Sequence, residues 1–143
     1  MTPETSAKTI QYVAYSFFGF AIIWGLAPYQ SINEPARILL DILDWPFGDR
    51  AALSRSEMWL SAIGAGLTVA ISIFLIGVVA PAIRASNRQV IRVTIWAFIA
   101  WYVVDSAGSY ASGVGSNVFF NTIFLAMVLF PLLLVRLEKD DSP

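Results

Sequence analysis

The chain contains no cysteine and no histidine among its 143 residues. Without cysteine it can form neither disulfides nor thiolate metal sites, and it can hold no c-type haem or thiol redox centre. Without histidine it lacks the commonest general base and the usual zinc and haem ligand. Lysine is nearly absent too, because Lys8 and Lys139 are the only two, both near the ends of the sequence. We therefore expect a protein that is not an enzyme and that carries no cofactor or metal.

Charge of either sign is also scarce. Charged residues make up 13% of the sequence and hydrophobic residues 57%, against about 25% and roughly 45–50% in soluble domains. A soluble domain of this size has no core large enough to bury so much apolar surface, whereas lipid accepts it. The net charge of -1 gives no reason to expect nucleic-acid binding. The composition predicts an integral membrane protein, and the lipid bilayer is its first expected partner.

Four apolar stretches are each long enough for a transmembrane helix, which needs about 20 residues. The first is too long for the apolar part of a typical signal peptide and has a poor cleavage site, so we expect it to be retained. The fold class we predict is all-α, a polytopic membrane protein built as a bundle of four transmembrane helices. The predicted segments are a cytoplasmic N-terminus at 1–8, spans at 9–27, 58–80, 90–112 and 117–137, an external loop at 28–57, a cytoplasmic loop at 81–89, an external turn at 113–116 and a cytoplasmic tail at 138–143.

Local signals mark several of these boundaries. Ser54 and Glu57 have the spacing of a capping box at the start of the second span, and Ser86 with Gln89 repeats that spacing before the third. Pro81 is expected to end or kink the second span, because proline has no backbone N–H to continue a helix. The turn at 113–116 is so short that the third and fourth spans must be antiparallel neighbours.

The distribution of basic residues predicts the orientation. Cytoplasmic loops of membrane proteins are enriched in lysine and arginine. One side holds Lys8, Arg84, Arg88, Arg92, Arg136 and Lys139. The other holds Arg37, Arg50 and Arg55, offset by Glu34, Asp41, Asp44, Asp49 and Glu57. We expect both chain ends in the cytoplasm and a multi-pass location in a plasma membrane of the bacterial inner-membrane kind.

The external loop contains a predicted amphipathic helix at about 34–44. Asn33 can cap it, and proline is tolerated at position 35 in its first turn. One face carries Ile38, Leu39, Ile42 and Leu43, and the other carries Arg37, Asp41 and Asp44, with an Arg37–Asp41 pair at helical spacing. A turn at 45–48 is expected to end it. Such a helix is expected to lie in the outer interface and cover the bundle; the alternative is a docking surface for a partner protein or a lipid.

Asp105 is the one ionisable side chain deep within a predicted span. It lies roughly 20 Å from the inner edge and about 10 Å from the outer edge at 1.5 Å per residue, and such a residue needs protein or water around it. Asn121 is expected close to it across the short turn. The candidate polar site consists of Trp101, Tyr102, Asp105, Ser106, Ser109, Asn117 and Asn121. In a structural interpretation, a protonated Asp105 donates to Asn121 or a hydroxyl and Asn117 caps the fourth span. In a functional one, the carboxyl exchanges a proton or coordinates a cation.

Small residues recur every four positions on the second span, at Ala62, Gly66 and Ala70. Such spacing lets two helix backbones approach closely. The stripe is expected either to pack against another span of the same chain or to form an oligomer interface.

The function that these features favour is that of a non-enzymatic membrane subunit. It would act as an accessory, scaffold or assembly partner, with other membrane subunits or with further copies of itself. The alternative is a small transporter or channel that moves a proton, a cation or a small polar solute past Asp105.

Overall fold

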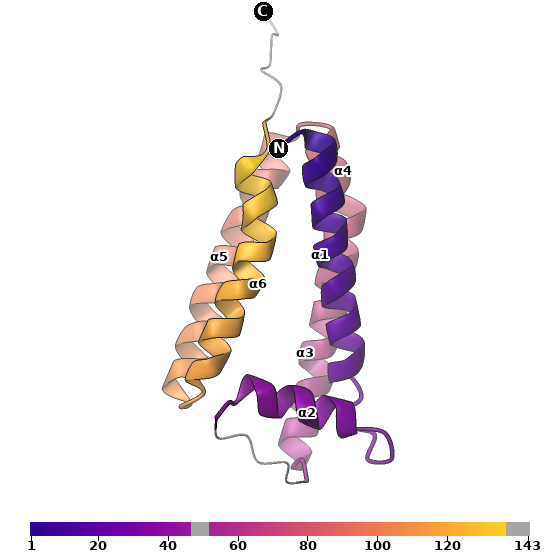
Figure 1. The fold of residues 1–143 in the computed structure, drawn as a ribbon, viewed down its shortest axis with the longest axis vertical. Coiled ribbons are helices and arrows are strands. Elements are labelled where there is room, and N and C mark those ends of the chain that lie inside the picture. The colour runs from indigo at the N-terminus through magenta and orange to yellow at the C-terminus, as the bar shows by residue number, and fades with distance from the viewer. Residues whose placement is uncertain (47–51, 137–143) are drawn as a thin grey trace, which may run out of the picture.

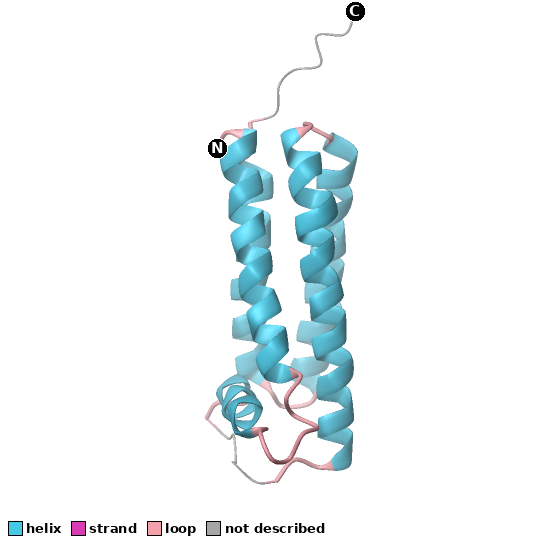
Figure 2. Ribbon diagram, turned by 90° about the vertical axis from the view of Figure 1, so that its right-hand side faces the viewer, coloured by secondary structure: helices cyan, strands magenta, loops and turns pink. Residues whose placement is uncertain are grey.

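The computed structural model describes residues 1–46 and 52–136, and every regular element in these two ranges is a helix, as the sequence predicts. The long helices run up and down beside one another, and a short helix lies across one end (Figures 1 and 2). The elements are α1 (Pro3–Trp24), α2 (Glu34–Leu43), α3 (Arg55–Phe74), the π-helical turn η1 (Leu75–Val79), α4 (Ala80–Arg84), α5 (Arg88–Ala111) and α6 (Gly115–Leu134). Some predicted features lie outside the described residues: the second half of the turn at 45–48, the charged residues Asp49 and Arg50, and the tail with Lys139.

Three continuous helices in the described part are long and apolar enough to cross a membrane: Arg55–Arg84, Arg88–Ala111 and Gly115–Leu134. This is the architecture of a multi-pass membrane protein. The 22-residue α1 is not among them. Lys8 and Gln11 dilute its apolar character, and the helix ends at Trp24, before the apolar residues Leu26 and Ala27. Four crossings therefore stay a prediction.

The capping box at the start of α3 is confirmed. The Ser54 hydroxyl accepts from the Glu57 amide at 3.2 Å, and the Glu57 carboxylate accepts from the Ser54 amide at 2.6 Å. The cap proposed at Ser86 is wrong by one residue, because Asn87 caps α5 by accepting from the Val90 amide at 3.1 Å. Ser86 instead has a φ of 52°, the left-handed backbone that turns the chain after a helix end.

Pro81 does not end its helix. The chain widens into η1 immediately before the proline and then continues as α4 to Arg84. A π-helical turn changes the i→i−4 hydrogen-bond pattern that a proline interrupts. The outcome is one continuous helix of 30 residues, Arg55–Arg84.

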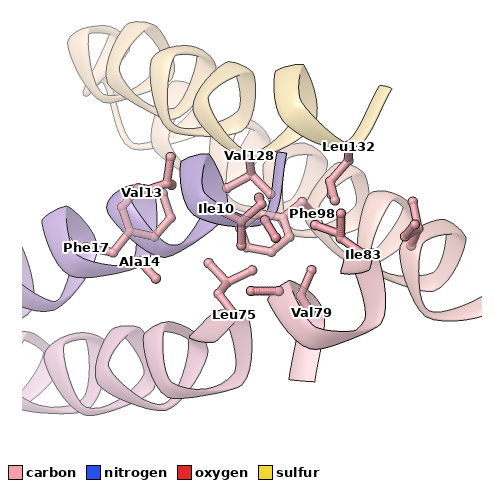
Figure 3. Packing of buried hydrophobic residues seen from close by; sticks show 13 residues of the cluster. Ile10, Val13, Ala14, Phe17, Leu75, Val79, Ile83, Phe98, Val128 and Leu132 are labelled. Carbon is pink, nitrogen blue, oxygen red and sulfur yellow. The ribbon is translucent and has the colours of Figure 1, made fainter. Parts of the chain in front are cut away.

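The helices form two antiparallel pairs, α1 with the continuous helix α3–η1–α4 and α5 with α6, and the pairs are joined mainly by contacts of α1 with α6 and of α4 and η1 with α5. We call the end with Met1 and the α4–α5 connection the N-terminal end, and the opposite end the α2 end. The pairs approach each other at the N-terminal end and diverge toward the α2 end (Figure 1). The core fills the region where they approach (Figure 3). It includes Ile10, Ala14, Phe17, Leu75, Val79, Ile83, Phe98, Val128 and Leu132.

The helix α2 lies across the α2 end, at a steep angle to the four long helices (Figure 1). Ala36 is buried, whereas Ile38 and Ile42 are exposed. Asn33 stands at the N-cap position but makes no capping bond, because its amide donates to the Ala27 carbonyl at 3.2 Å. The Arg37 guanidinium lies 3.0 Å from the carboxylate of Glu34, three residues earlier in the sequence. The predicted partner was Asp41, four residues later.

Candidate functional site

Four polar side chains meet between α5 and α6, around one oxygen of Asp105. Its Oδ1 accepts hydrogen bonds from the Asn121 amide at 2.9 Å, the Ser109 hydroxyl at 3.1 Å and the Asn117 amide at 3.2 Å. Asn117 also donates to the Ser109 hydroxyl at 2.8 Å. Ser106 lies at the edge, 3.4 Å from the Asn121 amide. We call Asp105, Ser109, Asn117 and Asn121 the Asp105 cluster.

The short α5–α6 turn brings these residues together. Residues 112–114 reverse the chain, so the last turns of α5 lie beside the first turns of α6. Ser109 lies one turn after Asp105, and Asn121 lies one turn after Asn117. The prediction that Asn121 lies close to Asp105 agrees with this geometry. In addition, the Ser116 hydroxyl donates to the Leu43 carbonyl, which ties the start of α6 to α2.

The Asp105 cluster faces the interior of the bundle. Asp105 is seven residues from the core residue Phe98, and Asn121 is seven residues from the core residue Val128, so each shares a helix face with the core. Between the cluster and the core lies Phe124, whose ring packs edge-on against Phe17 and Phe20 of α1, at 5.4 Å each. The cluster therefore continues the interior face toward the α2 end, where the helix pairs diverge.

Burial differs within the cluster. Asn121 is 3% exposed, whereas Asp105, Ser109 and Asn117 are only half-buried. A partly accessible carboxyl in a membrane helix is costly against hydrocarbon, and it needs water or protein beside it.

The direction of the hydrogen bonds differs from the structural interpretation of the sequence. A protonated Asp105 was expected to donate to Asn121 or to a hydroxyl, whereas the Asn121 amide and the Ser109 hydroxyl both donate to Asp105 Oδ1. Asn117 does not cap α6, since the helix begins at Gly115 with Val114 at the N-cap position. The Asn117 amide is directed at Asp105 and Ser109 instead.

Besides Ser106 at its edge, two further residues of the predicted site lie outside the cluster. The ring of Trp101 packs on Phe98, with centroids 6.2 Å apart. Tyr102 shares a hydrogen bond of 3.1 Å with Thr122, a residue that the sequence interpretation missed. The position of Thr122 directly after Asn121 was the available signal, but a threonine in a helix ordinarily bonds to its own backbone, as Thr122 also does to Val118.

The small-residue stripe of α3 is uncovered. Ala62, Gly66 and Ala70 are exposed, and a Cβ added to Gly66 meets no atom within 4 Å. The close contact with α1 uses a different face, where Gly64 lies against the Trp24 indole. Packing of the stripe within the chain is therefore not observed in the described residues. Ala62 and Gly66 line an open groove whose other wall includes Ala21, Ile22 and Gly25 of α1.

An ionic contact links α1 to α4 at the N-terminal end. The Arg84 guanidinium lies 2.8 Å from the Glu4 carboxylate and 3.2 Å from the Gln11 side-chain oxygen, and Lys8 lies 3.6 Å from Glu4. The hydrogen bond from Arg84 holds the pKa of Glu4 below its ordinary value of 4.5, helped by the charges of Arg84 and Lys8. Because these side chains are largely exposed, the contact is a weak tie between the helices.

In the described ranges, no group of three or more acidic residues is placed to hold a metal ion. Comparison of the chain with protein-family models, with curated proteins and with solved structures found no match. Function must therefore be argued from the geometry of the chain itself.

Proposed function

We propose that the protein crosses the membrane four times, with α1 as the fourth crossing. The support is the packing of α1, which runs antiparallel to α3 and also contacts α6 and α4. A helix of 22 residues that lies alongside membrane-crossing neighbours shares their layer, whatever its own hydropathy. Its polar residues Ser6, Lys8 and Gln11 cluster toward the N-terminal end, where a span meets the interface.

The charge distribution supports an orientation with the N-terminal end in the cytoplasm. Among the described residues, that end has five basic side chains and one acidic side chain, Glu4. The basic ones are Lys8, Arg84, Arg88, Arg92 and Arg136. The α2 end has Arg37 and Arg55, offset by Glu34, Asp41, Asp44 and Glu57. Lysine and arginine on the cytoplasmic side are the usual arrangement. Both ends of the chain then lie in the cytoplasm and α2 lies at the outer surface.

Within the membrane, the role we propose is that of a non-enzymatic subunit that associates with copies of itself or with other membrane proteins. The observation that carries this proposal is the uncovered stripe of Ala62, Gly66 and Ala70 on α3. Association of helices in lipid depends on close packing, which small residues allow. Leu67 and Ile73 on the same helix are also exposed, and their large apolar side chains suit contact with lipid. The small residues of the stripe suit contact with a second helix instead, because they let its backbone come close.

The test is the size of the protein in native membranes, extracted into lipid nanodiscs without detergent. Wild-type protein is expected in particles with more than one chain. Gly66→Leu is expected to yield single chains, because the larger side chain holds a partner backbone away. Gly108→Leu is the matched control, since Gly108 is also exposed with no atom within 4 Å of an added Cβ. Single chains in wild-type particles, or equal assemblies in both variants, contradict the subunit role.

A second candidate is transport of a proton, a cation or a small polar solute past Asp105. The half-buried carboxyl on the interior face favours it. Against it, the core closes the N-terminal end of the bundle, so transport requires a further conformation in which the helix pairs separate there. Flux into liposomes discriminates: a transporter loses flux on Asp105→Asn, and flux that is absent or unchanged by that substitution removes this candidate.

A further inference from the structure

We propose that the Asp105 cluster is a binding site for a small monovalent cation, an alkali-metal ion or ammonium, reached from the α2 end of the bundle. The inference rests on α5 and α6 lying in the bilayer, as proposed above, and it goes beyond a subunit role. It requires neither transport nor self-association.

The hydrogen-bond inventory of the cluster leaves acceptors without donors. The amide groups of Asn117 and Asn121 and the hydroxyl of Ser109 all donate to Asp105 Oδ1. In the described residues, nothing donates to Asp105 Oδ2 or to the side-chain oxygens of Asn117 and Asn121. The fully buried atoms that lack a partner in that part of the chain lie elsewhere, so these three oxygens keep access to their surroundings. A carboxylate oxygen and two amide oxygens are therefore left that only a donor or a cation can satisfy.

Among the described residues, no basic side chain forms an ion pair with Asp105. The sequence of α5 has arginine only at Arg88 and Arg92, in its first two turns, and α6 has no basic residue. Asp105 lies thirteen residues beyond Arg92, about 20 Å along the helix at 1.5 Å per residue. A carboxylate in low-dielectric surroundings without a cation nearby is unfavourable, and a bound cation removes that penalty.

The number and type of oxygen atoms select the class of ion. Calcium takes six to eight oxygen ligands and its sites commonly carry several carboxylates, while magnesium holds its water ligands tightly. One carboxylate and two amide oxygens match the charge of a monovalent ion, with water filling the remaining positions. Ammonium suits the same surface, because it offers donors to three acceptors.

The structure admits the ion from one side only. Phe17, Phe20 and Phe124 close the interior immediately on the core side of Asn121. On the other side the helix pairs diverge, and α2 crosses this end of the bundle (Figure 1). The route that we propose for the ion is therefore past α2, because the packed aromatic rings close the core side.

The experiment measures thermal stability of purified, detergent-solubilised protein, followed by tryptophan fluorescence. Sodium, potassium and ammonium chloride are titrated against choline chloride at constant ionic strength, because choline is too large for the site. With at least one of the three ions, the melting temperature of the wild type is expected to rise in a saturable way. The rise is about 3–6 °C when the ion is at roughly tenfold its dissociation constant.

Two variants make the result specific. Asp105→Asn keeps an acceptor for the three donors but removes the charge, so it is expected to fold and to lose the shift. Thr122→Val is the matched control on the same hairpin, outside the cluster, and is expected to keep it. Equal melting temperatures in all salts, or the same shift in Asp105→Asn, overturn the proposal. Because the measurement depends neither on orientation nor on assembly, its failure leaves the subunit role standing, and the reverse also holds.

Discussion

Two glycines two residues apart on α3 have opposite surroundings. A Cβ built on Gly64 lies 2.1 Å from Cη2 of the Trp24 indole, whereas one built on Gly66 meets no atom within 4 Å. Gly64 thus lies on the face of α3 that packs against α1, and Gly66 belongs to the uncovered face. The difference is invisible in the sequence, because small residues occupy most of positions 61–66 and so surround the helix on every side.

This contrast yields a prediction for stability. Gly64→Ala is expected to destabilise the protein by about 1–3 kcal/mol, because the indole must move out of a packed contact. Gly66→Ala is expected to be neutral or to stabilise by up to about 1 kcal/mol, because alanine favours a helix more than glycine does. Unfolding in mixed detergent micelles measures both. Equal stability of the two variants would show that α1 does not pack on α3 at Gly64.

The contact of Glu4 with Arg84 gives a prediction for pH. Because the folded-state pKa of Glu4 is lowered, its contribution to stability is present above the ordinary value of 4.5 and is lost as the pH falls through the folded-state pKa. Wild type is therefore expected to melt slightly above Glu4→Gln at neutral pH, and the difference is expected to disappear as the pH falls through the lowered folded-state pKa of Glu4. A difference that stays constant over this range contradicts an ionic tie between α1 and α4.

At the scale of the helix, the start of α3 is fixed by reciprocal hydrogen bonds of Ser54 and Glu57. Ser54→Ala is expected to lose about 1 kcal/mol of stability, since it leaves the Glu57 amide without its acceptor. Ser56→Ala is the matched control, because Ser56 is exposed in the same turn and its hydroxyl makes no hydrogen bond within the described part of the chain. The same micelle titration measures this pair, and an equal loss in both variants rules out the cap as the cause.

The sequence predicted the helices better than their details. The capping box was readable because serine and glutamate stand three residues apart, and the short turn at 113–116 placed Asn121 beside Asp105. The α5 cap was missed because Ser86 and Asn87 are both good capping residues, and backbone geometry chose between them. Pro81 was expected to end or kink its span, and the sequence alone did not decide between these outcomes; the helix continues past it by way of η1. The hydrogen-bond direction at Asp105 also depends on contacts that spacing alone does not define.

For the whole molecule, four elements with different local character form a single bundle. α3, α5 and α6 are apolar enough to enter lipid by themselves, while α1 depends on its neighbours for its place. The buried apolar cluster fills the region toward the N-terminal end, where the helix pairs approach each other. Toward the α2 end the two helix pairs diverge, the Asp105 cluster lies between α5 and α6, and α2 crosses the end of the bundle. That asymmetry is why binding is proposed at one end and closure at the other.

The most direct test of the four crossings is the accessibility of the two ends of α1. Since the chain has no cysteine, Thr2→Cys and Tyr29→Cys each introduce a single thiol, at exposed positions on either side of the helix. In intact cells, a membrane-impermeant maleimide is expected to label Tyr29→Cys alone, and permeabilised cells are expected to label both. Labelling of both thiols in intact cells would place the two ends of α1 on one side of the membrane and contradict the account.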